Sequence, residues 1–207
     1  DEQQKQQLEW QNSWGLSTRS IGVMILMHSD DKGLVLPPAV APLSVVIVPI
    51  LFDDSKARVL KEVQGLASRL KGKGLSVYVD DREGYTPGWK FNEWEVKGVP
   101  LRLELGPRDL EKKQVTLVRR DTGKKVAVLF ADVEREVVLQ LKTMQEDLYA
   151  KAAAFLDKNI EEVFTVTDAL KQIENKKLVF APWCGGKLCE ETFKEKSGAK
   201  SINSPLE

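Results

Sequence analysis

A tripeptide with two hydroxyl groups and a guanidinium, Ser17, Thr18 and Arg19, directly precedes a long apolar run. An arginine on a buried strand needs a partner that neutralises its charge. Either a carboxylate on a neighbouring strand does so, or a polyphosphate or stacked adenine meets its planar, bidentate guanidinium. Alternation along a strand would put Ser17 and Arg19 on one face and Thr18 on the other. Ser13 and Gly15 share the parity of Arg19, and their small size leaves room for a ligand.

Cysteine and histidine, the usual ligands of zinc, are scarce in this chain. Cys184 and Cys189 have four residues between them, which is an acceptable spacing for half of a zinc site. Because a structural zinc site takes four ligands, we expect two free thiols or a vestigial metal site there. The single histidine, His28, lies on an apolar run beside a turn, and we expect it to be a packing residue.

The composition describes an ordinary globular chain. Of 207 residues, 42% are hydrophobic and 30% are charged, and 31 Lys and Arg residues balance 31 Asp and Glu residues. No bulk charge draws such a chain to nucleic acid or to a membrane, so any basic surface must be local. The longest apolar stretch, residues 34–52, is interrupted by prolines, which predicts buried strands and turns rather than a membrane helix. Two cysteines are too few for a disulfide scaffold, and we expect a reducing, cytoplasmic location.

The apolar pattern predicts strands in the first third of the chain. Residues 22–36 predict a hairpin, and because both of its runs are apolar at successive positions, both faces should be covered. A buried strand over 43–52, a helix from about residue 56 to Gly72 and a strand over 75–79 follow. This order predicts a parallel pair of strands with a right-handed crossover.

The rest of the chain continues the alternation of helices and strands. Its expected elements are a helix from Pro87 to Gly98, strands over 101–105, 114–119 and 126–130, a long helix from about residue 133, a helix over 167–175 and a strand over 178–182.

Three segments resemble the prolyl-tRNA synthetase family, a class II family, in its eukaryotic and archaeal type. WQNSWGLSTRSIGVMILMHSDDKGLVLPP is similar to motif 3 and the closing strands of the catalytic domain. VDDREGYTPGWKFNEWEVKGVPLRLELGPRDLEKKQVTLVRRDTG resembles the anticodon-binding domain, and APWCGGKLCEE resembles the extra carboxy-terminal domain. The resemblance implies a mixed α/β chain. We expect the end of the antiparallel catalytic sheet in residues 1–41, a mixed-sheet anticodon-binding domain in 42–150, and a small, truncated, zinc-binding-like α/β domain in 151–207.

The same resemblance implies a reaction. The whole enzyme would use ATP and Mg²⁺ to activate proline and would transfer it to proline tRNA, as a homodimer without membrane contact. Arg19 would be the catalytic residue of motif 3 and would bind ATP together with Ser17 and Thr18. Ser13 and Gly15 would line the proline pocket. Zinc is not expected as a cofactor.

The segment DDREGYTPGWKFNEWEVKG, residues 80–98, surrounds aromatic rings with charges. Unstacked anticodon bases need flat partners and hydrogen bonds at their edges, and the phosphates between them need Lys or Arg. The expected anticodon-binding residues are Asp81, Arg82, Lys90, Glu95 and Lys97, and Arg102 and Arg108 would extend a basic edge. Alternatively, the rings of Trp89, Phe91 and Trp94 pack the helix onto the sheet, and the charges form a solvated face.

The sequence also departs from the family pattern. Ala39 stands where the family tends to have arginine after a double proline, and motifs 1 and 2 are absent from the sequence. We therefore expect that this chain alone does not aminoacylate. A non-catalytic, free-standing tRNA-binding module is the alternative, and an α/β domain used only for assembly is a further one.

Overall fold

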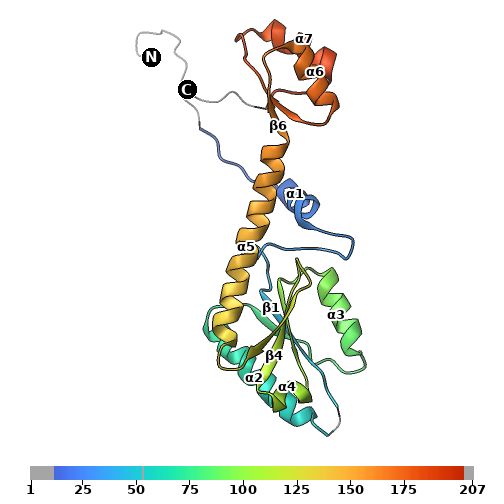
Figure 1. Ribbon diagram of the computed structural model, residues 1–207, viewed down its shortest axis with the longest axis vertical. Helices are drawn as coiled ribbons and strands as arrows, with labels where there is room; N and C mark the ends of the chain where they lie inside the picture. Colours follow the sequence, from blue (N-terminus) through green and yellow to red (C-terminus); the bar gives the residue numbers. More distant parts are fainter. Residues whose placement is uncertain (1–11, 53, 203–207) are drawn as a thin grey trace, which may run out of the picture. The chain divides into compact units, whose positions relative to one another are not determined.

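The computed structural model describes residues 12–52 and 54–202, and the chain divides into two compact units, Asp1–Glu146 and Asp147–Glu207. Figure 1 shows the order of the helices and strands along the chain. The predicted mixed α/β class is confirmed by a five-stranded mixed sheet in the first unit and a two-stranded sheet in the second. The division into three domains at residues 41 and 150 stays a prediction.

The sheet of the first unit has the strand order β2-β1-β3-β4-β5. Its strands are β1 (Val45–Pro49), β2 (Val77–Val79), β3 (Leu101–Leu105), β4 (Gln114–Arg119) and β5 (Lys125–Leu129). Strand β1 pairs in parallel with β2 on one side and with β3 on the other, whereas β3, β4 and β5 pair antiparallel. The predicted parallel pair on either side of a helix is therefore confirmed.

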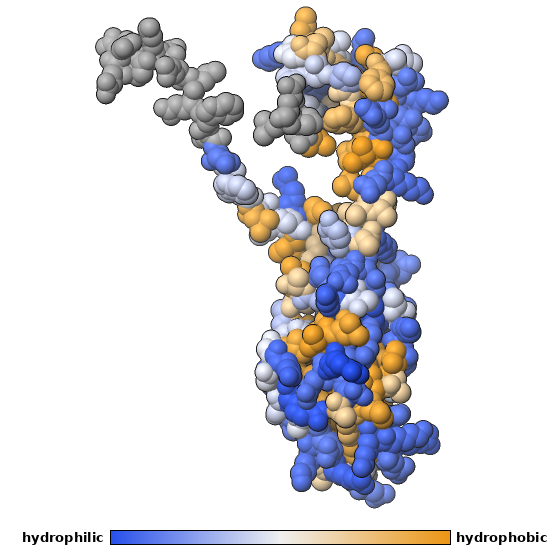
Figure 2. Space-filling view, turned by 60° about the vertical axis from the view of Figure 1, so that its left-hand side comes forward, coloured by the Kyte–Doolittle hydropathy of each residue, from blue (hydrophilic) through white to orange (hydrophobic). Residues whose placement is uncertain are grey.

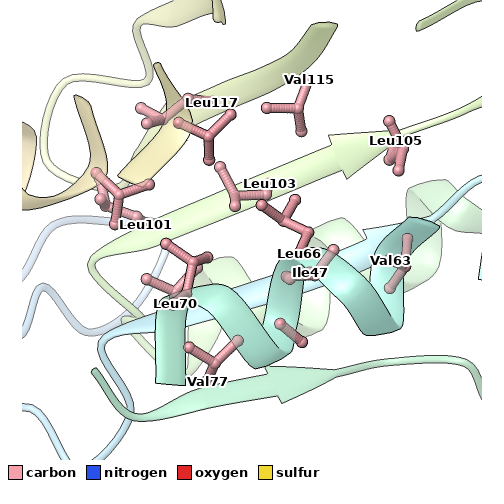
Figure 3. Close-up of a cluster of buried hydrophobic side chains, with 14 of the residues drawn as sticks. Ile47, Val63, Leu66, Leu70, Val77, Leu101, Leu103, Leu105, Val115 and Leu117 are labelled. Atoms are coloured by element: carbon pink, nitrogen blue, oxygen red, sulfur yellow. The ribbon is translucent and has the colours of Figure 1, made fainter. Parts of the chain in front are cut away.

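Helices cover both faces of this sheet. On one face, α2 (Lys56–Gly72) and the first part of α5 (Val133–Lys158) enclose the main core with alternate residues of the strands. Figure 3 shows side chains of α2, such as Leu66 and Leu70, gathered with Leu103 of β3. Burial of each such aliphatic side chain contributes about 1.5 to 3 kcal/mol. On the other face, α3 (Pro87–Val96) closes a smaller apolar cluster around β1.

An extended strip, residues 33–36, lies against the end of α3. The amide of Leu34 donates to the carbonyl of Val96 at 3.0 Å, and the amide of Leu36 donates to that of Gly98 at 3.3 Å. Gly33 and Gly98 both have positive φ, and a Cβ at either position would meet backbone at 2.6 Å. Glycine is therefore required on both sides of this close approach.

The predicted hairpin over residues 22–36 is wrong, because its first run is helical and its second run is hydrogen-bonded to residues 96 and 98 instead of to the first. Residues Arg19–His28 form a helix, α1, with no buried residue, and only an isolated bridge joins Asp30 to Gly33. A strand needs a neighbouring strand for its backbone hydrogen bonds, whereas a helix satisfies them within itself. The described residues offer this segment no strand to pair with. Its apolar side chains remain at the surface, where Figure 2 shows apolar residues in orange among hydrophilic ones in blue.

The second unit is a small α/β fold, as predicted. Strands β6 (Ile160–Glu162) and β7 (Leu178–Phe180) pair in parallel and are connected through α6 (Val166–Glu174), and α7 (Lys187–Ser197) follows. Thr165 caps α6, since its hydroxyl accepts a hydrogen bond from the amide of Asp168 at 3.1 Å.

Among the described residues, β6, the five-residue helix α4 (Pro107–Glu111) and the helix α7 were not predicted. In the described part of the chain, no helix has the length and apolar character needed to span a bilayer.

Candidate nucleic-acid interface

The helix α3 presents the segment that the sequence singled out. Thr86 is its N-cap and accepts a hydrogen bond from the amide of Trp89 at 3.3 Å, and Pro87 occupies the first turn. Phe91 and Trp94 pack against the small apolar cluster on the sheet. For these two rings the packing alternative holds, while Trp89 is 45% exposed.

A buried carboxylate, Asp80, ties the start of this segment together. Asp80 is fully buried, and its two oxygens accept hydrogen bonds from Arg82 Nε at 2.8 Å and Arg82 Nη2 at 2.7 Å. One of these oxygens also accepts the indole N–H of Trp94 at 2.7 Å. Arg82 reaches Glu93 on α3 as well. The guanidinium therefore bridges the end of β2 and the helix.

Lys90 holds the same loop from the interior of the protein. Its side chain is nearly fully buried, and its ammonium donates to the carbonyl of Asp80 at 3.0 Å and to that of Arg82 at 2.6 Å. The carboxylate of Asp80 lies 3.7 Å from the same ammonium. Lys90 is thus engaged inside the protein, and its contact with a ligand stays a prediction that the geometry does not favour.

The electrostatics of this cluster fix its charges. Burial alone would raise the pKa of Asp80, but hydrogen bonds from Arg82 and Trp94 and the charge of Lys90 outweigh it and lower the pKa to about 2. Arg82 lowers the pKa of Glu93 through a hydrogen bond, and Lys97 adds to this effect. The pKa of Arg82 is raised, first by its hydrogen bond to Asp80. Near neutral pH all three groups are ionised.

Above this cluster lies a stacked pair of aromatic rings. The ring centroids of Tyr85 and Trp89 are 4.3 Å apart with an interplanar angle of 24°. The guanidinium carbon of Arg82 lies 5.2 Å from the centroid of Tyr85 and 5.5 Å from that of Trp89. Both rings are close to half exposed. A cation held beside an exposed aromatic surface is the arrangement with which proteins stack unpaired bases.

The other predicted anticodon residues lie on the loop before α3, on α3 itself or just after it. Asp81 is exposed beside Arg82. Lys97 is 2.7 Å from a carboxylate oxygen of Glu93, and its ammonium lies 4.5 Å from the ring centroid of Trp94. Glu95 pairs with Lys32 at 3.2 Å. The structure thus brings the predicted residues onto one helix and its preceding loop.

A hollow of about 170 Å³ opens on the same face of the sheet, near the end of α3. Cationic side chains line it, but each of its arginines is paired: Arg102 with Glu104 at 2.8 Å, Arg119 with Asp121 at 2.7 Å, and Arg120 with Asp30 at 2.6 Å. Arg102 therefore belongs to an internal pair, while Arg108 is exposed on α4. The proposed basic edge is at most partial.

The predicted ATP and proline residues are arranged differently from expectation. Ser13, Gly15, Ser17, Thr18 and Arg19 are all exposed. Arg19 begins α1 instead of lying on a buried strand, so the expected alternation of faces does not apply. As arranged in this structure, these exposed residues do not enclose a site that fits ATP and Mg²⁺. Their roles stay predictions.

The two cysteines lie close together at the start of α7. Both are exposed free thiols. A hydrogen bond from the amide of Gly186 lowers the pKa of Cys184, and the neighbouring Cys189 thiol lowers it further, while the pKa of Cys189 is raised. Within residues 12–52 and 54–202, no group of three or more His, Cys, Asp or Glu side chains is placed to hold a metal ion. The half-site stays a prediction.

Sequence reasoning missed two residues of the interface, Tyr85 and Glu93. Tyr85 and Trp89 are four positions apart, and Glu93 follows Trp89 by another four. This spacing is the one that brings side chains together along a helix and its N-terminal extension, so it was the available signal. Asp80 belongs to the charged segment 80–98, but its burial cannot be read from the sequence.

Comparison with known proteins assigns the chain to a family. Residues 44–140 match the family model of an anticodon binding domain, and residues 166–207 match that of the prolyl-tRNA synthetase C-terminal domain. The cytoplasmic proline–tRNA ligase of Arabidopsis thaliana is 41% identical over 213 residues, covering 100% of this chain and 40% of the relative. A proline–tRNA ligase of Rubrobacter xylanophilus is 43% identical over 208 residues, covering 100% of the chain and 44% of the relative.

The bifunctional glutamate/proline–tRNA ligase of Drosophila melanogaster is 41% identical over 224 residues, which cover 100% of the chain but 13% of the relative. The chain thus spans less than half the length of these relatives. Its two family matches lie in the same order as the two compact units, and the similarity to ligases of this name extends over the whole chain. On these grounds the chain belongs to the prolyl-tRNA synthetase family.

Proposed function

We propose that this chain supplies the tRNA-recognising part of a proline–tRNA ligase. The whole protein would activate proline with ATP and Mg²⁺ and transfer it to proline tRNA, as the names of the relatives suggest. The single observation that carries the proposal within the chain is the exposed, stacked pair Tyr85–Trp89 with Arg82 beside both rings.

The geometry suits an unpaired anticodon base. Stacking on an aromatic side chain contributes about 1 to 3 kcal/mol per base, and a nearby guanidinium adds a favourable charge for the phosphate backbone. Asp81 offers acceptors for the edge of a base, and Lys97 offers a charge for a phosphate. Lys90 and Glu95 would act mainly by holding this surface in place, since both are engaged with other protein groups.

The roles of the amino-terminal segment rest on the resemblance alone. Arg19, with Ser17 and Thr18, would contact ATP, and Ser13 and Gly15 would contact proline. The whole enzyme would be a homodimer in the cytoplasm, and the name of the Arabidopsis relative supports the compartment. In the described residues, the side chains named for ATP and proline are all exposed.

Binding of tRNA is the direct test. Fluorescence anisotropy of a labelled proline tRNA should report binding to the chain, and a tRNA altered at the second and third anticodon bases should bind more weakly. The slope of log affinity against log salt counts the phosphate contacts. Equal binding of both tRNAs at every salt concentration would contradict anticodon recognition.

A non-catalytic tRNA-binding module is the second candidate, and the exposed state of residues 13–19 favours it for the isolated chain. ATP–pyrophosphate exchange with proline separates the two. We expect no exchange from the 207-residue chain and exchange from a full-length protein that contains it. A full-length protein that binds proline tRNA but never activates proline would establish the module instead.

A further inference from the structure

The loop that leads to the aromatic pair is fastened at one carboxylate. Residues 80–86 connect β2 to α3 without helix or strand structure. The side chain of Asp80 accepts hydrogen bonds from Arg82 two residues on and from Trp94 on the helix. The start of the loop is therefore drawn onto α3, at Trp94 in the last turn of the helix, before the chain reaches Tyr85.

We propose that Asp80 is the positioning residue of the anticodon interface, and this rests on the proposed function. Asp80 is fully buried and would not touch the RNA itself. It holds the guanidinium of Arg82 in a fixed orientation, so that Arg82 lies beside both rings and the ring of Tyr85 is kept stacked on that of Trp89. With the carboxylate removed, the rings would remain in the chain but would not be preorganised for a base.

The geometry explains why Asp80 and not its neighbours has this role. Arg82 donates two parallel hydrogen bonds to the carboxylate of Asp80, and this bidentate arrangement fixes orientation as well as distance. Glu93 contacts Arg82 through one nitrogen. Another tie of the loop is the ion pair of Glu83 with Lys56, but both of these side chains are largely exposed, and exposed pairs contribute little.

The chain offers a matched control for a variant of Asp80. Asp121 accepts two hydrogen bonds from Arg119, at 3.0 and 2.7 Å, across the same separation of two residues, and it lies in the same unit. Asp121→Asn therefore removes the same chemistry from a turn that carries no exposed ring pair. Asp80→Asn keeps the size of the side chain and removes its charge.

The first measurement is hydrogen exchange by mass spectrometry on the full chain, without RNA. We expect Asp80→Asn to accelerate exchange of the amides of residues 81–89, and Asp121→Asn to leave them unchanged. The second is anisotropy with proline tRNA. We expect Asp80→Asn to raise the dissociation constant roughly tenfold, the size of one lost base stack, and Asp121→Asn to change it less than twofold.

A double variant distinguishes positioning from general loss of stability. If Asp80 acts through the ring pair, Trp89→Ala and Asp80→Asn should each weaken binding, and the double variant should be no weaker than Trp89→Ala alone. Independent, multiplicative effects would overturn the proposal. So would unchanged exchange of residues 81–89 in Asp80→Asn.

The outcomes separate this proposal from the proposed function. If the wild-type chain does not bind proline tRNA, the proposed function fails and with it the role of Asp80 in recognition, although exchange still reports on the loop. If the chain binds but Asp80→Asn behaves like Asp121→Asn, the positioning role alone fails. Should Asp80→Asn not fold, Trp94→Phe removes one donor to the same carboxylate and keeps a ring, and we expect the same pattern with smaller amplitude.

Discussion

Two candidate regions of this chain, residues 13–19 and residues 80–97, were selected by the same reasoning from residue types, yet they are built in opposite ways. The first is exposed at every predicted position. The second is fastened by a buried carboxylate, a buried ammonium and an indole N–H. The difference teaches that a functional side chain is only as well placed as the groups that support it.

The boundary between the two kinds of structure lies near residue 30. From there on, the chain is tied to the first unit, since Asp30 pairs with Arg120 and the amide of Ala39 donates to Gln145 at 3.0 Å. Before it, α1 has no buried residue. Substitutions in the two regions should therefore differ greatly in how far they lower the free energy of unfolding.

The largest effect is expected at Lys90. Lys90→Met removes the buried ammonium that lies 3.7 Å from the carboxylate of Asp80, and the carbonyl groups of Asp80 and Arg82 lose the donor that Lys90 provides. Breaking such a pair typically costs about 3 to 5 kcal/mol of the free energy of unfolding. Urea denaturation followed by circular dichroism measures it. Lys97→Met is the matched control, because its pair with Glu93 is half exposed and should contribute about 0 to 1 kcal/mol. Equal losses of unfolding free energy in Lys90→Met and Lys97→Met would contradict the expected difference between a buried and an exposed ion pair.

A loss of tRNA affinity comes next. Arg82→Ala should weaken the binding of proline tRNA by about 1 to 3 kcal/mol if the guanidinium contacts a base. Arg135→Ala removes an exposed arginine of α5 and serves as the control for charge alone. An unchanged dissociation constant for Arg82→Ala, measured by anisotropy at fixed salt, would remove Arg82 from the anticodon residues.

Acid should lower the free energy of unfolding, because Asp80 in the second region becomes protonated. Its pKa in the folded protein is about 2, below the ordinary 3.8, so its carboxylate stabilises the fold above pH 3.8 and this contribution is lost as the pH falls toward 2. The contribution is about 2 kcal/mol. The free energy of unfolding measured between these pH values should fall less steeply in Asp80→Asn. Asp30, whose pKa is lowered to about 2 mainly by its hydrogen bond from Arg120, acts in the same direction, so Asp30→Asn is the reference variant.

The sequence predicted the parts of the fold that rest on local signals. The strands Leu101–Leu105 and Gln114–Arg119 have the predicted bounds, and α3 begins at the predicted proline. Pro87 and Gly98 act on the backbone directly, and the glycine is needed where the strip from residue 33 passes. Alternating and periodic apolar patterns predicted β1, β2, β5, α2 and α5.

What could not be predicted depends on distant partners. The apolar run of residues 19–28 has the composition of a buried strand, but the conformation of such a run depends on whether strands are present to pair with it. The burial of Asp80 and Lys90 likewise arises when the loop after β2 folds onto α3. Short elements such as α4 and β6 carry too few residues to show a period.

The smallest effect is expected in α1. Leu26 is 88% exposed, so Leu26→Ser should change the free energy of unfolding of the chain by less than about 0.5 kcal/mol. Leu70→Ala, at a fully buried position of α2, should cost about 2 to 5 kcal/mol in the same urea titration. A cost at Leu26 that approaches the cost at Leu70 would mean that the apolar face of α1 is covered in solution, and the contrast between the two candidate regions would then lie in their chemistry and not in their support.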